Sequence, residues 1–197
     1  MEEAVRQKER FMAVIRRTLS ESVDIIDIDD ISENGICWRT EETPAIVEKF
    51  KTAGIDALFL PFCDFGEEQA AAQIAASFHL PVLIWGARDE RPNTDVSRGR
   101  DTQCGMFAAT KVLRRHGVKY SYIYNCETES DAFAQGYDRF IRTAAVLKAL
   151  RNLRLAKIGD RPVPFMSVMT NEADLIRRMG VTVIPISPAE VSRRAKE

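Results

Sequence analysis

Apolar and polar residues alternate along the chain with two different periods. Stretches in which apolar residues recur every three or four positions, such as Val5, Met12, Ile15 and Leu19 near the N-terminus, predict amphipathic helices. Short apolar runs between these stretches predict buried strands. The helices are expected at residues 2–19, 43–54, 67–78, 101–116, 130–150 and 171–179. The strands are expected at residues 23–28, 57–60, 82–85, 120–124, 155–158 and 181–186.

Capping signals separate the helices from the strands. Thr43 is predicted as the N-cap of a helix with Pro44 at its first position, and Gly54 predicts the end of that helix. Because helices and strands alternate, we expect parallel strand pairing and an α/β fold. Its first part is an open parallel flavodoxin/Rossmann-like sheet with helices on both faces, followed by the start of a second α/β unit.

The same alternation predicts three parts of the chain. Residues 1–129 form a first α/β domain, residues 130–152 a long connecting helix, and residues 153–197 a partial second α/β domain. Ser187 and Glu190 have the spacing of a capping box for one more helix, so we expect the chain to end as another α/β turn begins. One βαβ unit with a trailing helix is small for an independent domain.

Composition narrows the classes of partner. The 197 residues carry 28 basic and 29 acidic side chains, and the resulting charge of -1 gives no field that would recruit nucleic acid or an anionic membrane. No apolar run reaches the roughly 18 to 20 residues of a membrane span, and the N-terminus is too charged for a signal peptide. We therefore expect a cytoplasmic protein whose partner is a small neutral molecule.

The four cysteines and two histidines do not form a metal-binding pattern. Cys37, Cys63, Cys104 and Cys126 are far apart, and no two of them form a C-x-x-C pair. The sequence therefore predicts no zinc site, and reduced thiols that behave as small apolar side chains are the favoured interpretation.

Candidate ligand contacts lie in the loops that follow the strands. In an open parallel sheet, ligands bind beyond the carboxyl ends of the strands, which here are the loops at residues 61–66, 86–100 and 159–169. The first loop brings together two aromatic rings, a thiol and a carboxylate. The second follows Trp85, whose flat ring suits a sugar, and it is long and dense in charge.

Each loop can also be interpreted as purely structural, without a role in ligand binding. The first can be a hydrophobic plug over the sheet, and the second a solvated loop of salt bridges. Acid/base catalysis by Asp89 and Glu90 is disfavoured because adjacent loop carboxylates usually diverge. The stretch from Gly159 has neither the glycine pattern nor the lysine of a phosphate-binding loop, which disfavours nucleotide binding. Met166 suits core packing as well as an apolar pocket wall.

These loops and helices occur in a recognisable order. The chain carries, in this sequence, the motifs DALFLPFCDFGEE, PVLIWGARDERP, RDTQCG, FIRTAAVLKALRNLRLAKIGDRP and PFMSVMTNEADLIRRMGV. In order and spacing, this series resembles the N-terminal region of the L-fucose/L-arabinose isomerase family, over essentially the whole chain.

The resemblance implies an aldose-ketose isomerase that depends on manganese and assembles as trimers or hexamers. In such an enzyme a proton moves between C1 and C2 of the sugar through an enediol, a divalent cation polarises the sugar oxygens, and carboxylates carry the proton. The family's metal ligands come from later domains. We therefore expect no catalytic residue and no bound Mn2+ in this chain alone. The family pattern also begins with a strand, bearing a substrate-facing arginine, ahead of the helix on which this chain opens.

The resemblance and the strand-end loops together assign candidate sugar contacts. Residues 62–65 resemble a segment that the family presents to a neighbouring subunit's sugar, although the family often has tryptophan where this chain has Cys63. Residues 161–166 match a pocket-facing segment of the family's second domain. The candidate contacts are Cys63, Asp64, Phe65, Trp85, Arg88, Asp89, Arg161 and Met166.

The function predicted from the sequence is the N-terminal portion of a sugar isomerase-like protein. The complete enzyme would take a pentose or a 6-deoxyhexose, and we expect this chain to be inactive alone because it lacks the metal-binding residues. The alternative is a non-catalytic module on the same scaffold that senses a sugar or supports oligomerisation.

Overall fold

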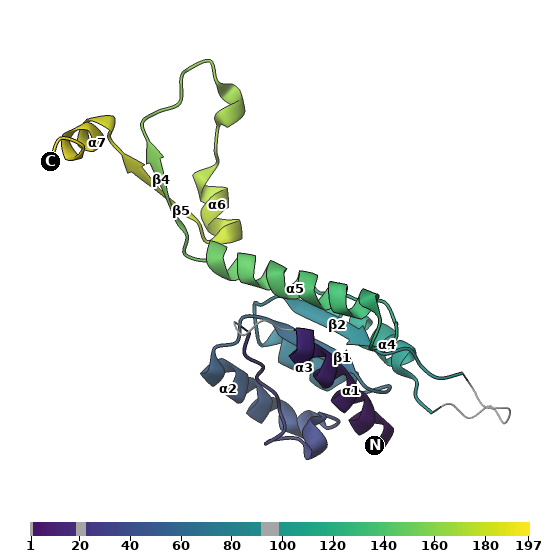
Figure 1. Cartoon of the computed structure of the whole chain (residues 1–197). Coiled ribbons are helices and arrows are strands. Elements are labelled where there is room, and N and C mark those ends of the chain that lie inside the picture. Colours follow the sequence, from purple (N-terminus) through teal and green to yellow (C-terminus); the bar gives the residue numbers. More distant parts are fainter. Residues whose placement is uncertain (1, 19–22, 92–98) are drawn as a thin grey trace. The chain divides into compact units, whose positions relative to one another are not determined.

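The computed structural model of the chain describes residues 2–18, 23–91 and 99–197. Contacts within the chain divide it into two compact units, Met1–Ala144 and Ala145–Glu197 (Figure 1). The division falls inside helix α5 (Asp131–Leu150), the helix that the sequence predicts as a connection. Leu19 of the predicted first helix, and Pro92 and Arg98 of the predicted strand-end loop, lie outside the described residues.

The first unit is built around a parallel sheet of three strands. Strand β2 (Val82–Gly86) lies between β1 (Leu58–Phe62) and β3 (Ser121–Tyr122), and it is parallel to both. An isolated parallel bridge between Ala87 and Cys126 extends the pairing beyond the short β3. The helices of this unit, besides α5, are α1 (Glu2–Thr18), α2 (Thr43–Ala53), α3 (Glu68–Ala76) and α4 (Thr102–Arg115), with the short 3-10 helices η1 (Glu33–Gly35) and η2 (Thr40–Glu42).

Side chains of β2 alternate between two apolar layers, one on each face of the sheet. Leu83 and Trp85 belong to the layer that α1 and α5 complete, whereas Val82 and Ile84 belong to the layer formed with α2, α3 and α4. All five residues of β2 are buried, as expected for a strand covered on both faces. The predicted open parallel α/β sheet with helices on both faces is confirmed.

The ends of α2 correct one detail of the sequence interpretation. Gly54 ends the helix as predicted, with a left-handed φ of 63° that favours glycine. Thr43, however, is the first helical residue rather than the cap, because Glu42 occupies the N-cap position. The buried hydroxyl of Thr43 has no hydrogen-bond partner among the described residues.

The strand predicted at residues 23–28 is not formed. This segment has no regular secondary structure, and none of the described strands pairs with it. The apolar run that suggested a buried strand instead leaves Ile25 and Ile26 exposed. A strand requires a hydrogen-bonded neighbour, and the prediction is wrong because no described segment supplies one.

Helix α5 packs one face against the sheet of the first unit. Its buried residues Phe133, Tyr137, Phe140 and Ala144 recur every three or four positions, which is the spacing of a single helix face. The exposed side carries charged residues such as Arg142. Within the described residues, no helix is long and apolar enough to cross a membrane.

The second unit is one βαβ motif followed by a helix. Strands β4 (Arg154–Ile158) and β5 (Thr182–Ile186) pair in parallel, and the chain between them forms η3 (Met166–Val168) and α6 (Glu172–Met179). Helix α7 (Pro188–Arg194) follows, with Ser187 as its predicted cap. This motif is the start of a second α/β unit that the sequence predicts.

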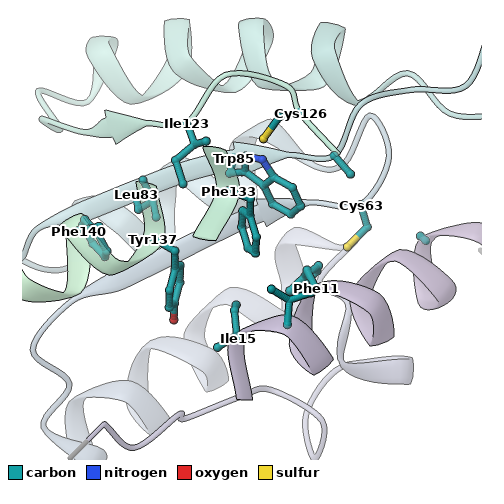
Figure 2. Close-up of a cluster of buried hydrophobic side chains, with 13 residues drawn as sticks. Phe11, Ile15, Cys63, Leu83, Trp85, Ile123, Cys126, Phe133, Tyr137 and Phe140 are labelled. Atoms are coloured by element: carbon teal, nitrogen blue, oxygen red, sulfur yellow. The ribbon is translucent and has the colours of Figure 1, made fainter. Parts of the chain in front are cut away.

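Trp85 lies at the centre of the layer between the sheet, α1 and α5. Its ring centroid is 4.1 Å from that of Phe133 and 6.0 Å from that of Phe11, so one aromatic contact comes from each helix. Figure 2 shows the indole ring enclosed by these side chains, with Cys126 above it. Only 1% of Trp85 is exposed, which makes it a main contributor to the core.

Replacement of this ring should therefore destabilise the protein. We expect Trp85→Ala to lower the free energy of unfolding by about 3 to 5 kcal/mol, the usual cost of truncating a buried aromatic residue. Trp38→Ala is the matched control because Trp38 is 44% exposed, and its effect should stay near about 0.5 kcal/mol. Urea titrations followed by circular dichroism measure both values. Equal effects of the two substitutions would contradict this account of the core.

Candidate functional site

The strands β1 and β2 end side by side, with Phe62 opposite Gly86. Three segments gather beyond this edge, at residues 63–66, 86–91 and 99–103, and together they are called the strand-end rim. The third segment contains the first turn of α4. Hydrogen bonds connect all three segments, so the predicted contacts of the first unit are brought to one edge of the sheet.

Trp85 does not contribute a surface to this rim. The sequence suggested a flat ring for a sugar at the strand end, but the ring points into the core beneath the rim. Its indole N–H is buried and has no hydrogen-bond partner among the described residues. A sugar-stacking role for Trp85 is not compatible with this burial, because side-chain alternation in β2 directs position 85 toward α1 and α5.

Cys63 also turns its side chain inward. The thiol packs in the same apolar layer as Trp85. Burial raises its pKa to about 12, and the cations of Arg100 and Lys8 only partly oppose this effect. The backbone carbonyl of Cys63 accepts a long hydrogen bond of 3.5 Å from Arg100 Nη1. Cys63 therefore contributes its backbone to the rim and not a reactive thiolate.

The carboxylates of Asp64 and Asp89 are used to hold the backbone. Asp64 Oδ1 accepts the N–H groups of Phe65 at 2.7 Å and Asp101 at 2.9 Å. Asp89 accepts the N–H groups of Thr102 at 2.9 Å and Gln103 at 3.1 Å. These two groups belong to the first turn of α4, where orphan N–H donors need an acceptor. Asp89 thus caps the first turn of α4 with its side chain, although Asp101 occupies the N-cap position.

Phe65 and Arg88 are the predicted contacts that remain exposed on the rim. Phe65 is 43% exposed although its backbone is tightly held. Its carbonyl lies against Gly105 of α4, and a side chain at position 105 would overlap it. Arg88 donates its backbone N–H to the carbonyl of Cys126 at 3.0 Å, and its side chain is exposed. Of the predicted contacts on the rim, Phe65 and Arg88 thus have the side chains most open to a ligand.

Arg100 and Glu90 complete the rim, although neither is among the sugar contacts predicted from the sequence. The guanidinium of Arg100 is buried and makes an ion pair of 2.9 Å with Glu90. It also donates to the backbone carbonyl of Arg88 at 2.7 Å. Several arginines occur in this loop, and nothing in their spacing indicates which of them is buried.

Arg161 and Met166 lie in the second unit, in the loop after β4. Arg161 donates to the backbone carbonyls of Pro162 and Val163, which folds the start of the loop on itself. Met166 is the first residue of η3 and is exposed, as is its neighbour Phe165. The core role that the sequence left open for Met166 is therefore not observed.

A metal site is not assembled by the described residues. Within the three ranges that the structure describes, no group of three or more His, Cys, Asp or Glu side chains is placed to hold a metal ion. The rim carboxylates of Asp64, Asp89 and Glu90 instead bind backbone amides or Arg100. The residues that the structure describes therefore do not fit a manganese site.

Comparison with protein families identifies the chain. Residues 1–151 match the model of the fucose/sulfoquinovose isomerase N-terminal domain. The chain belongs to this family. The match includes the whole first unit and ends one residue after α5. The resemblance that the sequence suggested is therefore confirmed for residues 1–151, whereas for residues 152–197 it stays a prediction.

Two curated relatives support the same family assignment. They are the sulfoquinovose isomerases of Priestia aryabhattai and of Priestia megaterium (strain ATCC 12872 / QMB1551). Each is 26% identical to this chain over 153 residues, which is 78% of this chain and 34% of the relative. The match thus spans about a third of the length of these relatives.

The close approach of Phe65 to α4 leads to a first test of the strand-end rim. We expect Gly105→Ala to displace the Phe65 segment and to destabilise the domain, because the new methyl group would meet backbone atoms of Phe65. Gly136→Ala in α5 is the comparison variant, since its methyl group would meet a side chain, that of Ile123 at 2.7 Å, and not the backbone.

Both substitutions gain about 1 kcal/mol of helix propensity, so their difference isolates the clash. Thermal unfolding measures it, and Gly105→Ala should melt several degrees below Gly136→Ala. Equal melting temperatures would show that the rim is not packed against α4 as described.

The burial of the thiols leads to a second test. Cys104 is exposed on α4, whereas Cys63 and Cys126 are buried. The pKa of Cys63 is raised to about 12 by burial, so the thiol stays protonated throughout the neutral range and reacts slowly. Alkylation at pH 8 followed by peptide mass spectrometry should label Cys104 in the folded protein, and should label Cys63 only after urea is added. Early labelling of Cys63 would contradict its placement in the core.

Proposed function

We propose that this chain is the N-terminal part of an aldose-ketose isomerase and that its strand-end rim contacts the sugar substrate. The observation that carries the proposal is the family match over residues 1–151, which includes all three segments of the rim. The interlocked backbone of the rim supports it further, because a sugar site needs polar and aromatic groups that are fixed in place before binding.

Within the rim, we assign the sugar contacts to Phe65 and Arg88. The ring of Phe65 is exposed while its backbone is held by Asp64 and Gly105, so it offers a preorganised apolar face to a sugar. The exposed guanidinium of Arg88 supplies hydrogen-bond donors for sugar oxygens or for a sulfonate. Cys63, Asp64 and Asp89 do not contact the sugar in this assignment. They form hydrogen bonds that hold the backbone of the rim.

The reaction itself is assigned to residues outside the aligned part of the relatives. A proton moves between C1 and C2 of the sugar, which requires a base near both carbons and stabilisation of the enediol oxygens. The described residues assemble no metal site, and the match covers 34% of each curated relative. We therefore assign Mn2+ binding and the catalytic carboxylates to polypeptide that corresponds to the remaining two thirds. This chain alone would be inactive.

The substrate class follows from the sugars named in the family and its relatives. Fucose and sulfoquinovose are both hexoses without a hydroxyl group on C6, although sulfoquinovose carries a sulfonate there. We propose a sugar of this 6-deoxyhexose class, with pentoses such as arabinose as further candidates. A neutral sugar, which the net charge of -1 led us to expect, and the sulfonated sugar are both candidate substrates.

Assembly and location complete the proposal. A homo-oligomer, a trimer or a hexamer, would bring the rim of one subunit to the site of its neighbour and would explain why Phe65 is presented outward. We place the enzyme in the cytoplasm, where the four cysteines, all of them free in this structure, remain reduced.

The proposal is tested on the native protein. Antibodies against this chain would be used to isolate the polypeptide or complex that contains it from its own cells. We expect the isolated material to interconvert an aldose and a ketose from a panel of L-fucose, L-arabinose and sulfoquinovose with Mn2+, whereas the recombinant 197-residue chain shows no turnover. Turnover by the chain alone would contradict the assignment of the catalytic residues to other polypeptide.

Substitution of Phe65 tests the rim itself. In the native isomerase, Phe65→Ala should raise KM about fivefold with a smaller effect on kcat, since a lost aromatic contact is worth about 1 kcal/mol. Phe107→Ala on α4 is the matched control, because Phe107 is an exposed phenylalanine outside the rim. An unchanged KM in the Phe65 variant would remove the rim from the sugar site. Sugar binding without any turnover would favour a sensing module instead.

A further inference from the structure

Arg100 is the one buried lysine or arginine in the described part of the chain. Its side chain is 1% exposed, which is uncommon for an arginine and requires that its donors find acceptors. Nε and Nη2 form an ion pair with the carboxylate of Glu90, with distances between 2.9 and 3.2 Å. The remaining donors reach groups on three different segments of the chain.

These acceptors join the three segments of the strand-end rim. Nη2 donates to the carbonyl of Arg88 at 2.7 Å, just after β2. Nη1 lies 3.5 Å from the carbonyl of Cys63, just after β1, and 3.4 Å from the hydroxyl of Thr102 at the start of α4. One planar group therefore lies between the ends of two parallel strands and the first turn of the following helix.

Two predicted contacts with exposed side chains, Phe65 and Arg88, lie on segments that Arg100 joins. Phe65 follows Cys63 by two residues, and the carbonyl that accepts from Nη2 belongs to Arg88 itself. The position of Phe65 relative to Arg88 thus depends on the guanidinium of Arg100. Asp64 and Asp89 connect the same segments to α4, but neither connects the ends of the two strands to each other.

We propose that Arg100 is a positioning residue whose guanidinium sets the spacing between Phe65 and Arg88 and so shapes the sugar-contacting rim. This inference rests on the proposed function for its consequence, although the positioning itself does not. The planar fork is essential because its five N–H donors point in fixed directions toward acceptors on separate segments. A lysine ammonium at this place would keep the charge but could not reach all of these acceptors.

Hydrogen exchange of the purified chain tests the positioning. We expect Arg100→Lys to speed amide exchange about tenfold in peptides covering residues 63–66 and 86–91, while peptides from α3 and α5 keep their wild-type rates. Arg142→Lys is the matched control, because Arg142 makes an exposed ion pair with Asp138 on α5. Wild-type exchange in the rim of Arg100→Lys, or equal acceleration in every peptide, would overturn the proposal.

Chemical rescue separates guanidinium shape from charge. In Arg100→Ala, methylguanidinium should slow exchange of the rim again, and methylammonium at the same concentration should not. Rescue by both cations, or by neither, would overturn the role of the planar fork.

Two substitutions of Glu90 replace this experiment if Arg100→Ala fails to fold. Glu90→Gln keeps an acceptor for Arg100 and should preserve the rim, whereas Glu90→Ala should loosen it. Equal exchange in these two variants would overturn the proposal.

A kinetic measurement distinguishes this inference from the proposed function. In the native isomerase, Arg100→Lys should raise KM about tenfold and change kcat less, because the contacts that it positions serve binding. Loosened exchange together with an unchanged KM would uphold the positioning by Arg100 and would overturn the placement of the sugar on this rim.

Discussion

Burial of strand β2 on both of its faces is the constraint on which the first unit depends. Each face of the strand needs its own apolar layer, since side chains alternate from one side of a sheet to the other. Trp85 and Leu83 bring α1 and α5 to one face, and Ile84 and Val82 bring the other helices to the opposite face. A strand enclosed in this way ends at a fixed point, so the segments that follow it start from a rigid base.

The charged side chains beyond the end of β2 form hydrogen bonds that hold the backbone of the rim in place. Asp89 accepts hydrogen bonds from the backbone amides in the first turn of α4, and Asp64 links the end of β1 to the same turn. Arg100 joins the two strand ends through their carbonyls. Because these groups satisfy one another, Phe65 and Arg88 remain outward. The proposed sugar site would therefore depend on contacts that a sugar does not touch.

The second unit contrasts with the first in what it buries. Within residues 145–197, Val181 is the buried apolar side chain, whereas Leu155, Ile158 and Ile176 are exposed. Two parallel strands are fewer than an independently stable sheet usually has. The family match, which ends at residue 151, has the same boundary to within a few residues as the division between the units.

The sequence by itself determined the order of elements and the edge of the sheet where a site can form. Helical periodicity, Gly54 as a helix end and the short apolar runs are local signals, and the elements they indicate were found, apart from residues 23–28. That segment failed because a strand exists only with a hydrogen-bonded neighbour, which no local pattern reports. The order of the motifs also identified the family.

Only the tertiary structure decided which side chains of the loops face a ligand. Trp85 and Phe65 are both aromatic residues near strand ends. Trp85 is buried because β2 is covered on both faces, whereas Phe65 follows the end of β1 and its ring stays exposed while its backbone lies against Gly105. Arg100 and Arg88 are likewise equivalent as loop arginines, but Arg100 is distinguished by its burial and by four acceptors on three segments. Such choices depend on distances between residues remote in sequence, and the packing of β2 sets those distances.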